Sequence, residues 1–326
     1  MSNKKFKVVI TDAEYPSINN EKKVLSKLNV ELIKFQCKTD EEIIRNCRDA
    51  DGILNQYAKI TSKVIEKLDN VKIITRYGIG VDNIDLDAAT KKGIFVANVI
   101  YDISDVADHT ITLMLSLIRK LILIEKSIKK LEWDWKNFHP IARIKGKTVG
   151  IIGLGKVGRQ VAKRIKAFDV NILACDPYIQ ADVFKKYKAT RVNYETLLEQ
   201  SDIVTLHVPL NNETKHMIST NQLNKMKKTA ILINCARGGI IDEKALYKSL
   251  KEKKIAGAGL DVLEQEPIKK DNPFLSLDNV IITPHMGWYS EEAVDEVQRI
   301  AAEQVLQCLQ GIVPVNLVNK DVLKNR

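Results

Sequence analysis

The fold is decided by the stretch Thr148-Val-Gly-Ile-Ile-Gly153-Leu-Gly155-Lys-Val-Gly158. An apolar, β-branched run leads here into a G-x-G-x-x-G sequence, and a helical pattern follows to Phe168. A second strand pattern at Asn171–Cys175 ends at Asp176, which lies 23 residues after Gly153 (176 minus 153). Strand, glycine turn, helix, strand and acidic residue in this order are typical of a dinucleotide-binding unit, whereas the glycines alone would also suit a purely structural loop.

Each residue of this pattern has an expected physical role. Gly153 permits the tight turn, Gly155 lets a pyrophosphate approach the backbone, and Gly158 allows the helix to pack closely on the strand. The helix N-terminus then presents N–H groups to phosphate. Asp176 would accept hydrogen bonds from the ribose hydroxyls of the adenosine, and its charge would repel a 2′-phosphate. The pattern therefore predicts NAD rather than NADP as the cofactor.

Short strand patterns alternate with helical patterns on both sides of this stretch. Such alternation predicts parallel sheets covered by helices on both faces, and the two series predict two doubly wound α/β units. The expected strands are Phe6–Ile10, Val30–Phe35, Gly52–Leu54, Val71–Thr75, Ile94–Val96, Thr148–Ile152, Asn171–Cys175, Ile203–His207, Ala230–Asn234, Ile255–Leu260 and Val280–Thr283. The expected helices are Asn20–Leu28, Asp40–Cys47, Ser62–Leu68, Asp85–Lys91, Lys156–Phe168, Tyr194–Gln200, Glu243–Lys251 and Ser290–Leu309. A longer, nearly all-apolar helix is expected at Ser104–Ile124, with Ser104 as its N-cap, buried at a domain junction or a subunit interface.

Length and composition agree with a globular protein of two domains. The 326 residues carry a formal net charge of +10, and the basic residues are scattered rather than gathered into a nucleic-acid-binding motif. The five cysteines show no CxxC pair and no zinc-ligand spacing, so we expect neither a disulfide scaffold nor a metal site. Arg119 and Lys120 interrupt the most apolar segment, Ile111–Ile124, which argues against a membrane span. Met1–Phe6 shows no leader pattern, and we expect a cytoplasmic protein.

Three polar segments follow expected strands of the second unit. They are Asn234–Gly239, Gly259–Pro267 and Thr283–Trp288. The carboxyl ends of parallel strands meet at one edge of a sheet, and open α/β sheets bind their ligands there. We therefore expect these segments to lie beside the glycine turn.

The same segments have the right chemistry for reducing a carbonyl group. A hydride that arrives at a carbonyl carbon leaves an alkoxide that needs a proton, which His285 is suited to donate. Glu266 would favour the imidazolium and fix the ring. Arg237 offers a bidentate contact to a substrate carboxylate and can polarise the carbonyl. Asp261 would orient the nicotinamide through its carboxamide. Taken singly, the arginine suits a surface ion pair, the glutamate a loop and the histidine a turn cap.

In combination, these segments and the glycine turn resemble the D-isomer-specific 2-hydroxyacid dehydrogenase family over essentially the whole chain. Further motifs that carry the resemblance are Arg76-Tyr-Gly-Ile-Gly-Val-Asp-Asn-Ile-Asp85, Val106-Ala-Asp-His-Thr110 and His207-Val-Pro209. His285–Glu291 is similar to the C-terminal-binding-protein branch of the family, whereas Arg76–Ala88 is closer to phosphoglycerate dehydrogenase. Val99–Ser104 departs from both patterns.

The resemblance implies that Arg237, Glu266 and His285 are the catalytic trio and that the backbone of Tyr77–Gly80 holds the substrate carboxylate. Trp288 would shape the substrate pocket or, alternatively, pack in the core. The substrate domain of the family is discontinuous, so we expect a flavodoxin-like substrate domain of residues 1–101 plus 289–326 and an inserted Rossmann NAD-binding domain of residues 102–288. The implied partners are a small 2-oxo or 2-hydroxy carboxylate and a second copy of the chain in a homodimer, with no nucleic acid and no membrane.

Motifs and resemblance together give the expected site residues. The expected cofactor contacts are Gly153, Leu154, Gly155, Lys156, Val157, Gly158, Asp176, His207, Val208, Pro209, Thr214, Cys235, Ala236, Arg237, Asp261, His285 and Gly287. The expected substrate contacts are Tyr77, Gly78, Ile79, Gly80, Arg237, His285 and Trp288. We expect His109 to be a hydrogen-bonded structural residue and Cys235 to be a small residue at the floor of the cofactor site rather than a nucleophile.

The leading hypothesis is an NAD-dependent oxidoreductase that interconverts a 2-oxoacid and a D-2-hydroxyacid, with His285 as acid and base. One alternative is a dinucleotide-sensing protein that binds peptides, like the corepressors of the tryptophan-containing branch. A second alternative is a dehydrogenase of a substrate such as formate or phosphite. The sequence specifies no peptide groove, and it does not name the 2-hydroxyacid.

Overall fold

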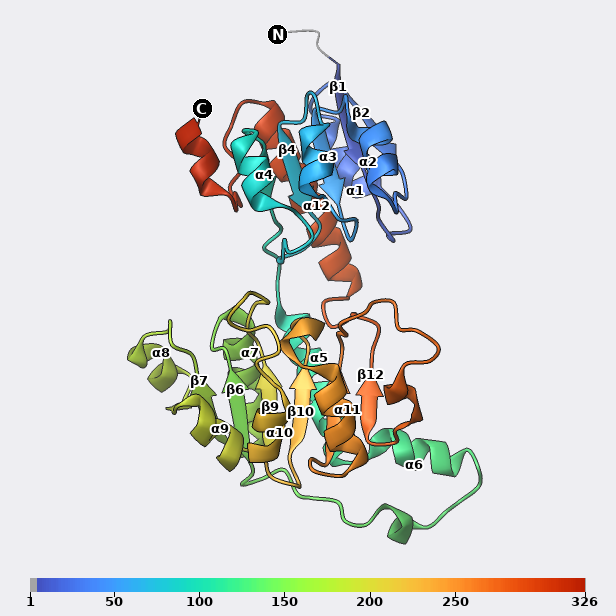
Figure 1. Cartoon of the computed structure of the whole chain (residues 1–326), viewed down its shortest axis with the longest axis vertical. Coiled ribbons are helices and arrows are strands. Elements are labelled where there is room, and N and C mark those ends of the chain that lie inside the picture. Colours follow the sequence, from blue (N-terminus) through green and yellow to red (C-terminus); the bar gives the residue numbers. More distant parts are fainter. Residues whose placement is uncertain (1–4, 326) are drawn as a thin grey trace. The chain divides into compact units, whose positions relative to one another are not determined.

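The structure is a computed structural model that describes residues 5–325. Its residues form two compact units, one made of Met1–Asp102 with Ser290–Arg326 and the other of Ile103–Tyr289 (Figure 1). The division expected from the sequence, 1–101 plus 289–326 against 102–288, places both junctions one residue earlier. Met1–Lys4, on which the expectation of a missing leader rests, and Arg326 lie outside the described residues.

Unit 1 is built on a five-stranded sheet whose strands all run parallel. In chain order the strands are β1 (Phe6–Ile10), β2 (Val30–Lys34), β3 (Gly52–Asn55), β4 (Ile73–Arg76) and β5 (Phe95–Ala97). Their order across the sheet is β2-β1-β3-β4-β5, which is the flavodoxin-like order. The flavodoxin-like prediction for this unit is therefore confirmed.

Helices cover both faces of this sheet. On one face lie α1 (Asn19–Leu25) and the long α12 (Glu291–Leu309), which pack on each other, with α12 also against β3 and β4. The other face carries α2 (Asp40–Cys47), α3 (Ser62–Glu66) and α4 (Leu86–Lys91), and its core includes Val9, Ile53 and Ile74. Because α12 supplies one of the two layers, the C-terminal segment completes the unit that the first hundred residues begin.

Unit 2 is built on a seven-stranded parallel sheet. Its strands are β6 (Thr148–Ile152), β7 (Asn171–Cys175), β8 (Thr190–Arg191), β9 (Ile203–Leu206), β10 (Ile231–Asn234), β11 (Gly257–Leu260) and β12 (Val280–Ile282). The order across the sheet is β12-β11-β10-β9-β6-β7-β8. Successive strands are added in one direction from β6 to β8 and in the opposite direction from β9 to β12, which is the doubly wound order of a Rossmann unit.

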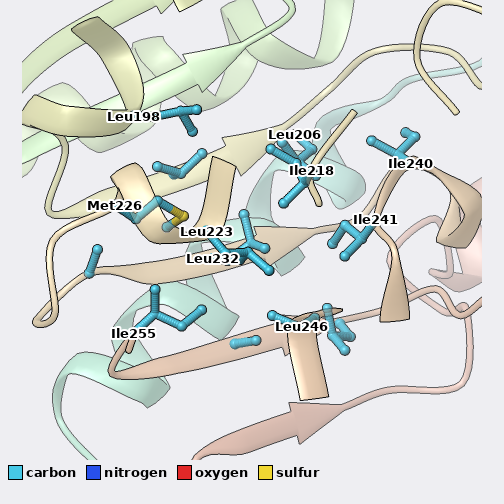
Figure 2. Packing of buried hydrophobic residues seen from close by; sticks show 14 of the residues in the cluster. Leu198, Leu206, Ile218, Leu223, Met226, Leu232, Ile240, Ile241, Leu246 and Ile255 are labelled. Atoms are coloured by element: carbon cyan, nitrogen blue, oxygen red, sulfur yellow. The ribbon is translucent and has the colours of Figure 1, made fainter. Parts of the chain in front are cut away.

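Two apolar layers flank this sheet. The first is formed with α5 (Ser104–Ile118), α7 (Lys156–Ile165) and α8 (Ala181–Lys186). The second is formed with α9 (Tyr194–Gln200), α10 (Thr220–Lys225) and α11 (Glu243–Lys251). Figure 2 shows the second layer, where Leu198, Leu223 and Leu246 from the three helices meet sheet residues such as Leu232. The remaining elements are α6 (Leu121–Ile128) and the 3-10 turns Trp135–Phe138, Lys166–Phe168, Gly238–Ile240, Pro273–Ser276 and Lys320–Asn325.

The expected helix Ser104–Ile124 is wrong in two respects. The helix ends at Ile118, because Lys120 adopts a left-handed conformation with φ of 54°, and α6 starts a new direction at Leu121. Ile103 rather than Ser104 occupies the N-cap position. None of the helices in the described part of the chain is long and apolar enough to cross a membrane.

Candidate active site

The glycine turn lies at the carboxyl edge of the unit 2 sheet, between β6 and α7. Gly153 has φ of 90°, and a Cβ atom on it would lie 2.6 Å from the carbonyl oxygen of His207, so both conformation and space require glycine. A Cβ atom on Gly158 would lie 2.1 Å from the carbonyl oxygen of Gly153, which shows the close helix–strand approach expected there. At Gly155, by contrast, a Cβ atom would meet open space.

Gly155 is also the N-cap of α7, and no side chain caps this helix end. The first amides of the helix therefore face open space, where the positive end of the helix dipole favours an anion. A pyrophosphate group fits this cradle.

Asp176 follows β7 and is anchored beside the turn. Its Oδ2 accepts from the Leu154 amide at 2.8 Å, and its Oδ1 accepts from the Tyr178 amide at 3.0 Å. Each carboxylate oxygen has a second acceptor position, so hydrogen bonds from ribose hydroxyls remain compatible with this geometry.

The segment after β9 forms the opposite wall of the turn. The His207 amide donates to the Ile152 carbonyl at 2.8 Å, and its ring Nε2 lies 3.0 Å from the Thr205 hydroxyl. Burial lowers the pKa of His207 to about 3, so the imidazole is neutral. Further along, the Thr214 hydroxyl donates to the Pro209 carbonyl at 2.6 Å and accepts from the Asn211 amide at 2.9 Å. Thr214 thus shapes this loop, and direct cofactor contacts of residues 207–209 and Thr214 stay predictions.

A histidine–glutamate pair lies at the same edge, after β11 and β12. His285 Nδ1 is 2.7 Å from Glu266 Oε2, with the two side chains 26% and 37% exposed. The other oxygen of Glu266 accepts from the Leu263 amide at 2.9 Å. Because a carboxylate only accepts hydrogen bonds, the proton of the pair resides on Nδ1 of the ring. Nε2 of His285 has no partner within the described residues of the unit and is available for proton transfer.

Asp261 fixes the turn that presents His285. Its Oδ1 accepts from the Thr283 hydroxyl at 2.6 Å and from the Met286 amide at 2.9 Å, and its Oδ2 accepts from the Gly287 amide at 2.8 Å. His109 Nε2 lies 3.3 Å from Oδ1. Burial acts to raise the pKa of Asp261, but the hydrogen bonds from His109, Thr283 and the two amides hold it below its ordinary value.

Asp261 is therefore a buried anion, with 3% of the residue exposed, that organises its own loop. Its expected hydrogen bond to a nicotinamide stays a prediction. His109 Nε2 also lies 2.9 Å from the Thr283 hydroxyl. Since that hydroxyl gives its hydrogen to Asp261, His109 Nε2 is the donor in this contact. The part-buried His109 thus has the hydrogen bonding that we expected of a structural residue.

Arg237 lies in the loop that follows β10, the strand next to β11 in the sheet. The Asn234 side chain bridges this loop, accepting from the Ala236 amide at 3.0 Å and donating to the Arg237 carbonyl at 2.9 Å. A Cβ atom on Gly238 would lie 1.9 Å from the carbonyl carbon of Leu263, so the Arg237 loop touches the loop that holds Glu266. Strands β10, β11 and β12 are adjacent, and the predicted catalytic trio therefore occupies one edge of one sheet.

Cys235 sits between Asn234 and Arg237 and is part-buried. Burial raises the pKa of its thiol to about 12. The sulfur is therefore a neutral thiol near neutral pH, which agrees with a floor residue and argues against a nucleophile.

In unit 1 the expected carboxylate-binding loop follows β4. Gly78 has φ of 136°, and its carbonyl accepts from the Val99 amide at 3.0 Å. The Asn98 side chain donates to the Ile79 carbonyl at 2.8 Å. The Tyr77 and Gly78 amides bond within the unit, to the carbonyls of residues 55 and 76. The next three amides, of residues 79–81, make no hydrogen bond among the described residues, and such a run of N–H groups suits an anion.

The Tyr77 side chain points away from solvent and supports this loop from inside. Its hydroxyl donates to Glu21 Oε1 at 2.7 Å, and the Gln298 side-chain amide lies 3.0 Å from both oxygens of Glu21. The Tyr77 ring also meets Tyr15 edge-on, with centroids 5.2 Å apart. Burial raises the pKa of Glu21 above its ordinary value. Only the backbone of Tyr77 is thus available to a substrate.

Several residues of these networks were not found from the sequence. Glu21 meets Tyr77, and Gln298 meets Glu21, only in three dimensions, and no local pattern marks either residue. His216 showed no partner pattern, yet its Nε2 lies 2.8 Å from Glu264 Oε1. Trp288 is part-buried and packs edge-on against Tyr289, with centroids 5.7 Å apart, so its side chain joins an aromatic pair of unit 2.

Comparison with known proteins identifies the family. Residues 111–287 match the sequence profile described as "D-isomer specific 2-hydroxyacid dehydrogenase, NAD binding domain". The chain belongs to this family. Within it, unit 2 contains the NAD-binding domain, which agrees with the open cradle at Gly155 and with the expectation of NAD as cofactor.

Named relatives lie in the phosphoglycerate dehydrogenase-like part of the family. The chain is 49% identical to D-3-phosphoglycerate dehydrogenase of Methanocaldococcus jannaschii over 86% of its own length and 54% of the relative's. It therefore spans about half the length of such relatives. It is 43% identical to glyoxylate reductase of Thermofilum pendens over 88% of its own length and 86% of the relative's. A solved D-lactate dehydrogenase of Aquifex aeolicus, complexed with NAD and lactic acid, aligns with a TM-score of 0.85 at 29% identity over 98% of each chain.

Proposed function

We propose that this protein is an NAD-dependent dehydrogenase that interconverts a 2-oxoacid and a D-2-hydroxyacid. The single observation that carries the proposal is the His285–Glu266 pair, 2.7 Å apart at the carboxyl edge of the NAD-binding sheet, with Nε2 of the ring unpartnered within its unit. Relatives named glyoxylate reductase, D-lactate dehydrogenase and D-3-phosphoglycerate dehydrogenase support the substrate class.

The residues divide the chemistry among them. The bound cofactor would supply a hydride to the substrate C2 as NADH, and in the reverse direction it would accept that hydride as NAD. In the reducing direction His285 gives the proton on Nε2 to the carbonyl oxygen, and in the oxidising direction Nε2 takes it back. Glu266 accepts a hydrogen bond from the Nδ1–H group of His285 and stabilises the positive charge of the ring. Arg237 polarises the carbonyl, and the amides of residues 79–81 bind the carboxylate.

A spectrophotometric panel tests the proposal. The protein is mixed with NADH and with glyoxylate, pyruvate, hydroxypyruvate or phosphohydroxypyruvate, and in separate reactions with NAD and formate or phosphite. We expect NADH oxidation with at least one 2-oxoacid and a product of D configuration wherever C2 becomes chiral. NADH that stays intact with every 2-oxoacid, or turnover with formate or phosphite alone, would refute the proposal.

We also propose that a second copy of the chain covers an apolar arm of unit 2. In this arm Leu131, Trp133 and Trp135 are 92%, 89% and 75% exposed, and Leu121 and Ile122 of α6 are exposed as well. Exposed apolar side chains gathered in one short segment are typical of a subunit interface. Light scattering after gel filtration should give twice the mass of the chain, and a W133S/W135S variant should give a larger fraction of monomer. A wild-type monomer at micromolar concentration would contradict this.

A further inference from the structure

A side-chain bridge crosses the cofactor side of the unit 2 sheet. The Tyr178 hydroxyl donates to Glu213 Oε2 at 3.0 Å. Tyr178 belongs to the loop after β7 and Glu213 to the loop after β9, and β6 lies between these two strands in the sheet (Figure 1). The bridge therefore spans the crevice where the strand order reverses, which is where sheets of this kind bind nucleotides.

The backbone holds both ends of the bridge. The Tyr178 amide donates to Asp176 Oδ1 at 3.0 Å, which ties the tyrosine to the carboxylate expected at the ribose. The Glu213 amide donates to Asn211 Oδ1 at 2.9 Å, and the Thr214 amide donates to the same oxygen at 3.0 Å. A tight turn thus presents Glu213 toward the tyrosine, although both side chains are exposed.

Two carboxylates act on the same phenol. The hydrogen bond to Glu213 and then the charges of Glu213 and Asp176 raise the pKa of Tyr178. Glu213 accepts a hydrogen bond from the Tyr178 hydroxyl, and Asp176 accepts one from the Tyr178 amide, so a single tyrosine links the two carboxylates. Asp176, the carboxylate expected at the ribose, is thus linked through Tyr178 to a second carboxylate that the sequence pattern does not mark.

We propose that Glu213, held by Tyr178, is a second acidic determinant of cofactor choice and that it disfavours a 2′-phosphorylated dinucleotide. The inference rests on the proposed NAD-dependent function and adds to it a residue outside the glycine fingerprint. A 2′-phosphate carries between one and two negative charges near neutral pH. At low ionic strength the Debye length exceeds about 10 Å, so a carboxylate fixed one tyrosine side chain from Asp176 still repels that phosphate.

The expected change in NADPH affinity is small because the Glu213 side chain is exposed to solvent. Charge interactions between exposed groups are weak, which here corresponds to a change in affinity of about three- to fivefold. Salt screens such interactions, so the change should shrink as ionic strength rises. Packing or shape effects of Glu213 would not show this salt dependence.

Calorimetric titration of the full-length protein with NADH and with NADPH tests the inference without relying on turnover. The variants are Glu213→Gln, Tyr178→Phe and the matched control Glu199→Gln, which removes an exposed carboxylate from α9 of the same unit. At low salt we expect E213Q to bind NADPH about three- to fivefold more tightly, with NADH affinity within twofold of wild type. Y178F should show a smaller gain and E199Q none.

An unchanged ratio of NADPH to NADH affinity in E213Q would overturn the inference, as would an equal change in E199Q or a gain that persists at high salt. In each of these cases wild-type NADH binding would still stand, and with it the proposed function. A wild-type protein that binds neither dinucleotide would overturn both.

Discussion

Replacing Glu266 with glutamine tests the proton-transfer pair with little change in shape. In the structure one oxygen of Glu266 faces the Leu263 amide and the other faces His285 Nδ1. If the carbonyl of the glutamine keeps the amide contact, its NH2 group meets Nδ1. The ring then becomes an acceptor at Nδ1, and it loses the negative partner that stabilises its charged form.

The expected loss of kcat/KM follows from how exposed the His285–Glu266 pair is. A hydrogen bond to a charged group contributes about 1.5–3 kcal/mol, and the lower end applies because the side chains of His285 and Glu266 are 26% and 37% exposed. A loss of about 1.5 kcal/mol corresponds to about a tenfold drop in kcat/KM. The assay is NADH oxidation with the best 2-oxoacid of the panel.

Glu264→Gln is the matched control, since it makes the same change two residues away, where the side chain pairs with His216 instead. We expect E264Q to stay within about twofold of wild type. Equal kcat/KM for E266Q and wild type would refute the assigned role of Glu266, and an equal loss in E264Q would reduce it to a general charge effect of the loop.

Three further variants probe the other parts of the site. Asp176→Ala should lower the preference for NADH over NADPH about tenfold, because it removes the anchored carboxylate beside the turn, and an unchanged ratio of the two KM values would contradict this. Tyr77→Phe should raise the KM for the 2-oxoacid and lower the free energy of unfolding by about 1–3 kcal/mol, because buried Glu21 loses a donor. Tyr187→Phe in unit 2 is the control. An unchanged KM in Y77F would contradict the role of Tyr77 in supporting the carboxylate-binding loop. Asp261→Asn should flatten the acid side of the stability profile. The pKa of Asp261 is lowered in the folded state, so its contribution is present above the ordinary value of about 3.9 and is lost as pH falls through the folded-state value. Urea unfolding at several values between about pH 5 and 2 should therefore show a steeper loss for wild type than for the variant, and parallel profiles would rule this out.

Local patterns in the sequence were sufficient to predict an element when all the residues that define it lie in one short segment. The strand at Thr148–Ile152, the strand at Asn171–Cys175 and the helix at Asp40–Cys47 have the bounds that their patterns predict. At the last of these, Thr39 and Glu42 form a capping box that fixes where the helix begins. The glycine turn could be predicted for the same reason, since tight turn and close packing each demand a residue without Cβ.

Sequence patterns failed to predict helices that are too short to show a repeating spacing of apolar residues. Helices α8 and α10 each have six residues and bury only Phe184 and Leu223 respectively, so no apolar period exists to be detected. The break after Ile118 was missed because the apolar residues resume at Leu121, and the left-handed Lys120 gives no signal in a pattern of hydrophobicity.

The residues of the candidate site also fall into those that local sequence predicts and those that it does not. His285, Glu266 and Arg237 could be named because strand ends collect at one edge of a parallel sheet, and each residue type suits one step of the chemistry. The partner of Tyr77 could not be named, because Glu21 lies 56 residues before it (77 minus 21). Gln298, which in turn bonds to Glu21, lies 277 residues from Glu21, and the two meet only because α1 and α12 pack together. Contacts of this kind carry no local mark in the sequence.

The proposed function depends on His285 Nε2 as the group that moves the proton in an NAD-dependent reduction. The most direct measurement compares wild type with His285→Ala for NADH affinity, by fluorescence titration, and for kcat with a saturating 2-oxoacid. We expect NADH affinity within about threefold of wild type and kcat reduced by about 10²- to 10⁴-fold. A variant that binds NADH normally and keeps full kcat would contradict the account.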